Sequence, residues 1–262
     1  MMARAVLRNG LGAFSDGAVL LPLLALLSSS AGMSGTLLLV SAGLTYVVSA
    51  LVFRVPMSVQ PLKSIAVAAV VLGASALEVR MSAFLLGAAC LVLCFFDVER
   101  LARRVPIAVV HQLQVGLGVL LVMQGASTHW SWVGVAVAAV MILRPEVAGI
   151  PILGLLATAG IVWGVSRGLD SPGVAPSVVS VGAGLRPEMI AGLLLPQLVL
   201  TWANSVLATR IACEKYFGAR ASRVTIRRLL SSIGVGNLLV GVLGGMPFCH
   251  GSGGVTAHVR GG

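Results

Sequence analysis

Few side chains in this sequence could do chemistry, and almost all of them lie inside or beside long apolar runs. Asp16 is the one carboxylate clearly inside such a run, and Cys249 directly precedes His250. The Cys249–His250 pair suggests a metal site, or a nucleophile with its base. Neighbouring residues of a helix do not face each other, and no further ligands cluster nearby in the sequence, so both hypotheses are disfavoured. We therefore expect no metal, no cofactor and no enzyme activity.

Two stretches rich in proline and glycine interrupt the apolar runs. Residues 55–63 read VPMSVQPLK and residues 244–254 read GGMPFCHGSGG, and the apolar runs before them align when Pro56 is placed on Pro247. Proline cannot donate to a helix ladder and glycine weakens it, so both stretches should be extended and become helical only partway across a membrane. Corresponding broken segments in two halves of a chain are typical of the binding site of an inverted-repeat transporter.

The elements that would position these residues are membrane-spanning helices. The sequence is 58% hydrophobic and only 10% charged, so no soluble core could bury its apolar surface. The net charge of +10 does not indicate nucleic acid as a partner, because the basic residues lie in the gaps between apolar runs. Since lysine and arginine are retained on the cytoplasmic face, their distribution predicts a cytoplasmic N-terminus and a cytoplasmic segment 210–230.

A membrane span needs about 20 apolar residues, which divides the chain into about ten helices. The expected spans are residues 12–30, 36–53, 57–73, 81–97, 105–124, 130–143, 150–167, 187–209 and 232–246, with a last one that starts near 249. The loop 168–186 is rich in proline and glycine, and it would join a first half of seven spans to an incomplete second half.

Several stretches resemble the molybdate transporter branch of the sulfate permease superfamily. They are residues 55–66 and 246–254, the Pro196-Gln197 and Asn204-Ser205 pairs of the eighth span, and the pattern from Gly12 to Pro22 in the first. The resemblance implies an all-α polytopic membrane fold of seven plus seven inverted helices, C-terminally incomplete here, with short extended segments before the third and tenth helices. It also implies a core domain, a gate domain, and an oxyanion bound between the third and tenth helices.

This fold would divide the chain into five parts. We expect a cytoplasmic N-terminus at residues 1–11, core-domain helices 1–4 at 12–104, gate-domain helices 5–7 at 105–167, a linker at 168–186, and core-domain helices 8–10 at 187–262. The apolar spans make the lipid bilayer an expected partner. Because such a chain lacks gate helices from a second half, we also expect either a second copy, as a homodimer, or a complementing C-terminal chain.

A tetrahedral dianion at bilayer depth must exchange its hydration shell for fixed donors, and two helix N-termini that face each other would supply them. The expected substrate-binding residues are Ser58, Val59, Gln60, Gln197, Asn204, His250, Gly251, Ser252 and Gly253. The residues expected to couple transport or to support the site are Asp16, Lys63 and Gln114. For Asp16, Gln197 and Asn204 the alternative is hydrogen bonding between helices, and for Lys63 it is a side chain that extends to the membrane surface.

These residues lead to one hypothesis and two alternatives. The chain would be a secondary active transporter of a tetrahedral oxyanion, with molybdate as the first candidate and sulfate as the second. One alternative is a transporter of the same fold for another small anion or a nucleobase, although the eighth span carries Gln197 where uracil transporters carry a glutamate. The other is a truncated or split half-transporter that is inactive alone.

Overall fold

The computed structural model of the chain describes residues 2–102 and 184–261, together with a few single residues between them. Almost all of the predicted gate helices 105–167 and most of the predicted linker therefore lie outside the described residues, and so does Gln114.

The described chain is almost entirely helical. Its first part contains α1 (Met2–Ala31), α2 (Gly35–Phe53), the strand β1 (Gln60–Pro61), α3 (Lys63–Leu72), α4 (Ala76–Leu93) and α5 (Val98–Ala102). Its second part contains α9 (Pro187–Leu200), the π-helix η1 (Thr201–Ala208), α10 (Thr209–Phe217), the 3-10 helix η2 (Gly218–Arg223), α11 (Ile226–Leu243), the strand β2 (Phe248–Cys249) and α12 (Ser252–Gly261). Four helical stretches among these residues are long and apolar enough to cross a membrane: Gly35–Phe53, Ala76–Leu93, Pro187–Arg223 and Ile226–Leu243.

Helices α4 and α11 begin earlier than their predicted starts at residues 81 and 232. The Ser75 hydroxyl accepts a hydrogen bond from the Glu78 amide, and the Glu78 carboxylate accepts one from the Ser75 amide at 2.8 Å, which is a capping box. Thr225 caps α11 in the same way as Ser75, through its hydroxyl. The predicted starts were late because the chain was divided at its charged residues, such as Arg80, whereas the caps decide where the helices begin.

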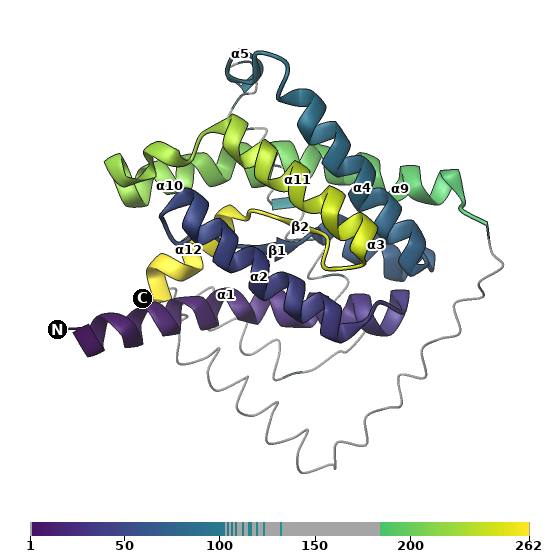
Figure 1. Cartoon of the computed structure of the whole chain (residues 1–262), viewed down its shortest axis with the longest axis horizontal. Helices are drawn as coiled ribbons and strands as arrows, with labels where there is room; N and C mark the ends of the chain where they lie inside the picture. The colour runs from purple at the N-terminus through teal and green to yellow at the C-terminus, as the bar shows by residue number, and fades with distance from the viewer. Residues whose placement is uncertain are drawn as a thin grey trace, which may run out of the picture.

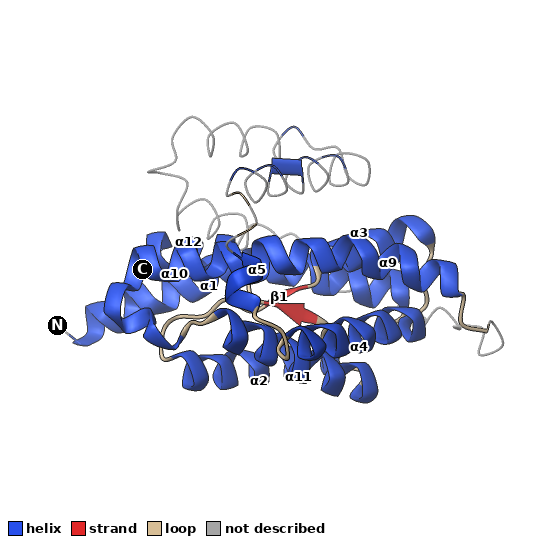
Figure 2. Ribbon diagram, turned by 90° about the horizontal axis from the view of Figure 1, so that it is seen from above, coloured by secondary structure: helices blue, strands red, loops and turns tan. Residues whose placement is uncertain are grey.

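The helices form two layers with the strands between them. Figure 2 shows α2, α4 and α11 in one layer, α1, α3, α9, α10 and α12 in the other, and β1 between the two. In the first layer α4 packs against α11, where a Cβ on Gly87 would fall 2.7 Å from the Gly234 carbonyl oxygen. In the second layer α1 packs against α12, where a Cβ on Gly12 would fall 2.4 Å from the His258 carbonyl oxygen. Both pairs of helices need glycine for this close approach.

The two broken stretches meet at the centre of the molecule (Figure 1). Strands β1 and β2 pair antiparallel, with Gln60 opposite Cys249. The Leu62 amide extends this pairing by donating to the Pro247 carbonyl at 3.0 Å. Helix α3 follows β1 and helix α12 follows β2, so each stretch is extended first and helical afterwards, as the sequence predicted.

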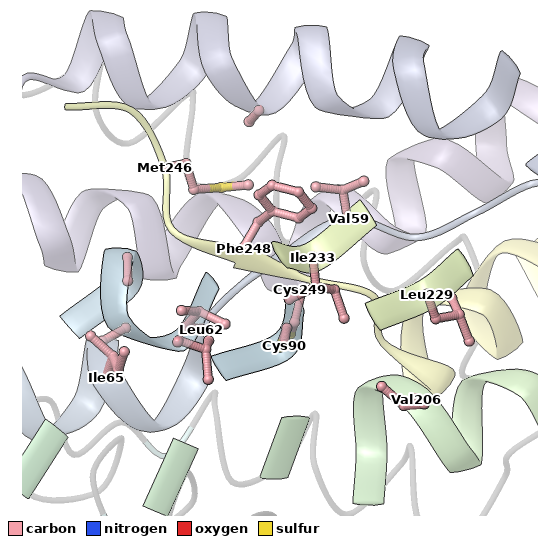
Figure 3. Close-up of a cluster of buried hydrophobic side chains, with 14 of the residues drawn as sticks. Val59, Leu62, Ile65, Cys90, Val206, Leu229, Ile233, Met246, Phe248 and Cys249 are labelled. Carbon is pink, nitrogen blue, oxygen red and sulfur yellow. The ribbon is translucent and has the colours of Figure 1, made fainter. Parts of the chain in front are cut away.

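Apolar side chains from both layers surround the paired strands. We call the place where β1 and β2 pair the crossing. Figure 3 shows buried residues around it, which include Val59, Leu62, Cys90, Val206, Leu229, Ile233 and Phe248. An unpaired polar group is costly in such surroundings, so the hydrogen bonds of the strands stabilise their pairing strongly.

Arginines join helix ends on one side of the molecule. Arg186 donates to Glu78 from Nε at 2.7 Å and from Nη2 at 2.8 Å, which ties the start of α9 to the start of α4. These hydrogen bonds raise the pKa of the Arg186 guanidinium above its ordinary value. Arg80 donates to the Gly241 carbonyl at 3.0 Å, near the end of α11.

Candidate functional site

Asp16, on α1, is fully buried and accepts three side-chain hydrogen bonds. The Tyr46 hydroxyl donates to Oδ2 at 2.5 Å, and the Ser58 hydroxyl and the Gln60 amide donate to Oδ1 at 3.0 and 2.7 Å. A buried carboxylate is stable only when such donors satisfy it. Asp16 therefore holds together α1, α2 and the extended stretch that leads into α3.

Helix α12 closes this cluster from the other half of the chain. A Cβ on Gly254 would fall 2.0 Å from the Ser58 hydroxyl oxygen and 2.2 Å from Asp16 Oδ1. Only glycine leaves room here for the backbone of α12 to lie against the carboxylate and its donors.

Gln60 uses its amide nitrogen within the protein. Its Nε2 donates to Asp16, and its buried Oε1 has no hydrogen-bond partner among the described residues. A Cβ on Gly251 would fall 2.5 Å from that oxygen. The unpaired atom of Gln60 is thus an oxygen, which can only accept hydrogen bonds. It cannot bind an anion, because an anion needs a donor.

Gln197 and Asn204 make hydrogen bonds between helices, which was the alternative to substrate contact. Gln197 Oε1 accepts from the Ser64 and Ile65 amides at 3.0 and 3.4 Å, so this side chain caps the N-terminus of α3. Asn204 Oδ1 accepts from the Ser252 hydroxyl at 3.0 Å, at the start of α12. Each amide therefore binds the first turn of one of the two helices that follow the strands.

The π-helix η1 shapes this contact with α12. Its wider turn is closed by the Thr209 hydroxyl, which donates to the Asn204 carbonyl at 3.0 Å and lies 3.3 Å from the His250 carbonyl. Short π-helical segments occur frequently at functional sites, because they re-aim side chains without ending the helix.

His250 is fully buried and has both ring nitrogens occupied. Nδ1 lies 3.0 Å from the Ser58 carbonyl and Nε2 lies 3.0 Å from the Ser232 hydroxyl. A carbonyl can only accept, so Nδ1 carries the proton, and in the neutral ring Nε2 accepts from Ser232. The ring also contacts Phe53 edge-on, with centroids 5.2 Å apart. The His250 side chain is therefore a structural link between the two halves.

Two of the predicted site residues face accessible space. Gly253, in the first turn of α12, is exposed, and a Cβ there would meet nothing within 4 Å. Lys63, the first residue of α3, is half-buried and makes no hydrogen bond or ion pair with any other described residue. By contrast Ser58, Val59 and Gly251 are buried.

Sequence analysis missed one residue of this site, Tyr46. Tyr46 is one of only two tyrosines in the chain and lies inside an apolar run, and a buried tyrosine hydroxyl usually has a polar partner. That signal points to Tyr46 but not to Asp16 as its partner. Within the described residues, no group of three His, Cys, Asp or Glu side chains could hold a metal ion.

Comparison with known proteins adds one finding. A family model described as molybdate transporter of the MFS superfamily matches residues 9–121 and 189–262, which is most of the chain. No curated protein and no solved structure matches it. The matched residues include the Asp16 cluster, both strands and both helices that follow them.

Proposed function

We propose that this chain, which belongs to the family of molybdate transporters of the MFS superfamily, moves a tetrahedral oxyanion across a membrane by secondary active transport. Its family is one of transporters, which confirms the expectation that the chain is not an enzyme. The family name supports molybdate as the first substrate. Sulfate, which has the same shape and charge, is the second.

The anion site that we propose is the first turn of α12 at Gly253, with Lys63 as its positive charge. The N-terminus of a helix offers unpaired amides and about half a positive charge to an anion. The corresponding amides of α3 at Ser64 and Ile65 already donate to Gln197, so α12 is the better of the two N-termini. The observation that carries the proposal is the open space at Gly253, beside an otherwise buried crossing.

Asp16 would support this site without contacting the anion. A carboxylate near a dianion repels it, whereas Asp16 is enclosed by three donors and by Gly254. It fixes Ser58 and Gln60, and through them the stretch that leads into Lys63.

The fold that we propose is the seven-plus-seven inverted repeat that the sequence resemblance to the sulfate permease superfamily implies, although the matching family model names the MFS superfamily. The N-caps Ser34 of α2 and Thr225 of α11 lie 191 residues apart and accept from the third helical amide in the same way. The groove between these helices is lined by eight residues of each, and each α2 residue has its counterpart 191 positions later. The α2 residues are Leu37, Val40, Ser41, Leu44, Thr45, Val48, Ser49 and Val52.

Binding of labelled molybdate to the chain in proteoliposomes, with uptake of molybdate and sulfate measured in parallel, tests the anion site. Gly253→Val should weaken molybdate binding about tenfold or more, because its side chain blocks the approach to the α12 amides and removes a charge-assisted hydrogen bond. Gly43→Val is the matched control, since Gly43 is exposed in mid-helix and also has nothing within 4 Å. Equal molybdate binding by both variants would show that the anion lies elsewhere.

A further inference from the structure

A long apolar groove runs between α2 and α11 on the face of the first layer. Its volume is about 790 Å³. Exposed side chains such as Leu44, Val48, Val235 and Leu239 form its walls, and Phe248 of β2 lies on its floor. This groove is separate from Gly253 and Lys63, neither of which lines it.

Most hydroxyls inside the groove already have hydrogen-bond partners within the protein. Ser41 donates to the Leu37 carbonyl at 2.6 Å and Thr45 donates to the Ser41 carbonyl at 2.7 Å. The Ser232 hydroxyl is hydrogen-bonded to His250. An occupant of the groove therefore needs no polar groups along its length.

One end of the groove is strongly positive. Arg223 and Arg228 both line it there, and among the described residues neither forms an ion pair. Arg210, by contrast, is paired with Glu99 and Glu214. Within the part of the chain that the structure describes, the Arg228 guanidinium makes one hydrogen bond, to the Arg223 carbonyl at 3.5 Å. The two guanidinium groups remain available to an anion.

We propose that the groove binds an anionic phospholipid, with its phosphate at Arg223 and Arg228 and an acyl chain along α2 and α11. The lining extends along α2 from Val52 to Leu37, which is about 22 Å of helix and more than the roughly 15 Å of one leaflet. Both arginines lie in the segment that the basic residues place on the cytoplasmic side, where pockets between helices bind anionic headgroups. An apolar groove with a cationic end matches this ligand in both of its parts.

Native mass spectrometry of the full chain in detergent, titrated with dioleoyl phosphatidylglycerol or dioleoyl phosphatidylcholine, tests the proposal. We expect one phosphatidylglycerol to be retained and phosphatidylcholine to bind more weakly. Arg223→Gln and Arg228→Gln should each weaken phosphatidylglycerol binding about fivefold, and the double variant about 25-fold. Arg220→Gln removes the same charge from η2 outside the groove and should have little effect.

A second variant tests the apolar part of the groove. Val235→Trp should fill the space between the walls and abolish phosphatidylglycerol binding while both arginines are retained. Glycerol phosphate, which has the headgroup without the acyl chains, should not compete at lipid concentrations. Equal binding by Val235→Trp and the unchanged chain, an equal effect of all three arginine variants, or full competition by glycerol phosphate would each overturn the proposal.

Discussion

At the scale of single residues, the Asp16 cluster decides how the crossing is held. One carboxylate accepts from Tyr46, Ser58 and Gln60, and Gly254 leaves room for it. A hydrogen bond to a charged group contributes about 1.5–3 kcal/mol when its alternative is an unsatisfied buried partner. Three such bonds on one side chain make Asp16 the residue whose loss should affect the site most.

Asp16→Asn replaces one carboxylate oxygen by a donor, which would face other donors. We expect Asp16→Asn to lower the thermal midpoint of the purified chain and to weaken molybdate binding. Tyr46→Phe should have the same two effects to a smaller extent, with a loss of about 1–3 kcal/mol in the free energy of unfolding. Thermal unfolding and molybdate titration of the same samples measure both effects.

Thr45→Val is the matched control for these two variants, because the Thr45 hydroxyl donates only to the carbonyl of Ser41 in its own helix. A thermal midpoint that falls as far for Thr45→Val as for Asp16→Asn would contradict the assigned role.

Part of this cluster could be predicted from the sequence. Asp16 was identified because a carboxylate in an apolar run is rare, and Gln60 because it lies in a broken stretch. The partners could not be found, because hydrogen bonding across helices depends on how the helices rotate and cross. Gln197 illustrates the limit. Its type allowed either substrate contact or hydrogen bonding between helices, and only its position over the first turn of α3 shows that it accepts from the Ser64 and Ile65 amides.

At the scale of elements, the α4–α11 pair is the most extensive helix contact in the first layer. Gly87 meets Gly234, and Gly241 lies against the Arg80 carbonyl and the Phe84 side chain. Small residues at such contacts let backbones approach, which is the main source of helix association in a membrane. The contact fixes α11, and α11 leads directly into β2.

Gly87→Val should separate α4 from α11, since its Cβ would fall 2.7 Å from the Gly234 carbonyl oxygen and 2.8 Å from the Leu238 amide. Backbone atoms cannot give way as a side chain can, so we expect a loss of about 1–3 kcal/mol or more in stability. Thermal unfolding monitored by size-exclusion chromatography gives the shift.

Gly192→Val in α9 is the control for that variant, because its Cβ would make only an ordinary contact, 3.6 Å from Leu72 Cδ1. If both variants unfolded at the same temperature, the glycine contact would not be what holds α4 and α11 together.

The elements themselves were predicted better than their ends. The positions of both broken stretches were predicted correctly from their prolines and glycines, because these residues interrupt a helix locally. The starts of α4 and α11 were missed because Ser75 and Thr225 extend the helices past charged residues. The pairing of β1 with β2 has no local signal, since the two strands, Gln60–Pro61 and Phe248–Cys249, are far apart in the sequence.

At the scale of the whole molecule, the charges define two sides. Arg80 and Arg186 bind helix ends on one side, while Arg210, Arg223 and Arg228 lie in or after α10 on the other. Since basic residues are retained in the cytoplasm, the second side should be cytoplasmic. The orientation stays a prediction that labelling can decide.

Ser222→Cys and Leu185→Cys place a thiol at an exposed position on either side. In intact cells a membrane-impermeant maleimide should label Leu185→Cys and leave Ser222→Cys unlabelled until the membrane is opened. The unchanged chain gives the background, since three of its four cysteines are buried and Cys94 is half-buried. Labelling of Ser222→Cys from outside would invert the topology.

The pairing of β1 with β2 limits how a transporter of this kind can move. Separating the strands would expose backbone groups that have no water to replace their partners, at a cost of several kcal/mol for each group. The hydrogen bonds of the His250 ring and the hydrogen bond from the Leu62 amide to the Pro247 carbonyl would have to break as well. The two half-helices are therefore expected to travel as one rigid unit throughout the cycle. On this view the substrate is released from Gly253 and Lys63 while the two paired strands stay closed.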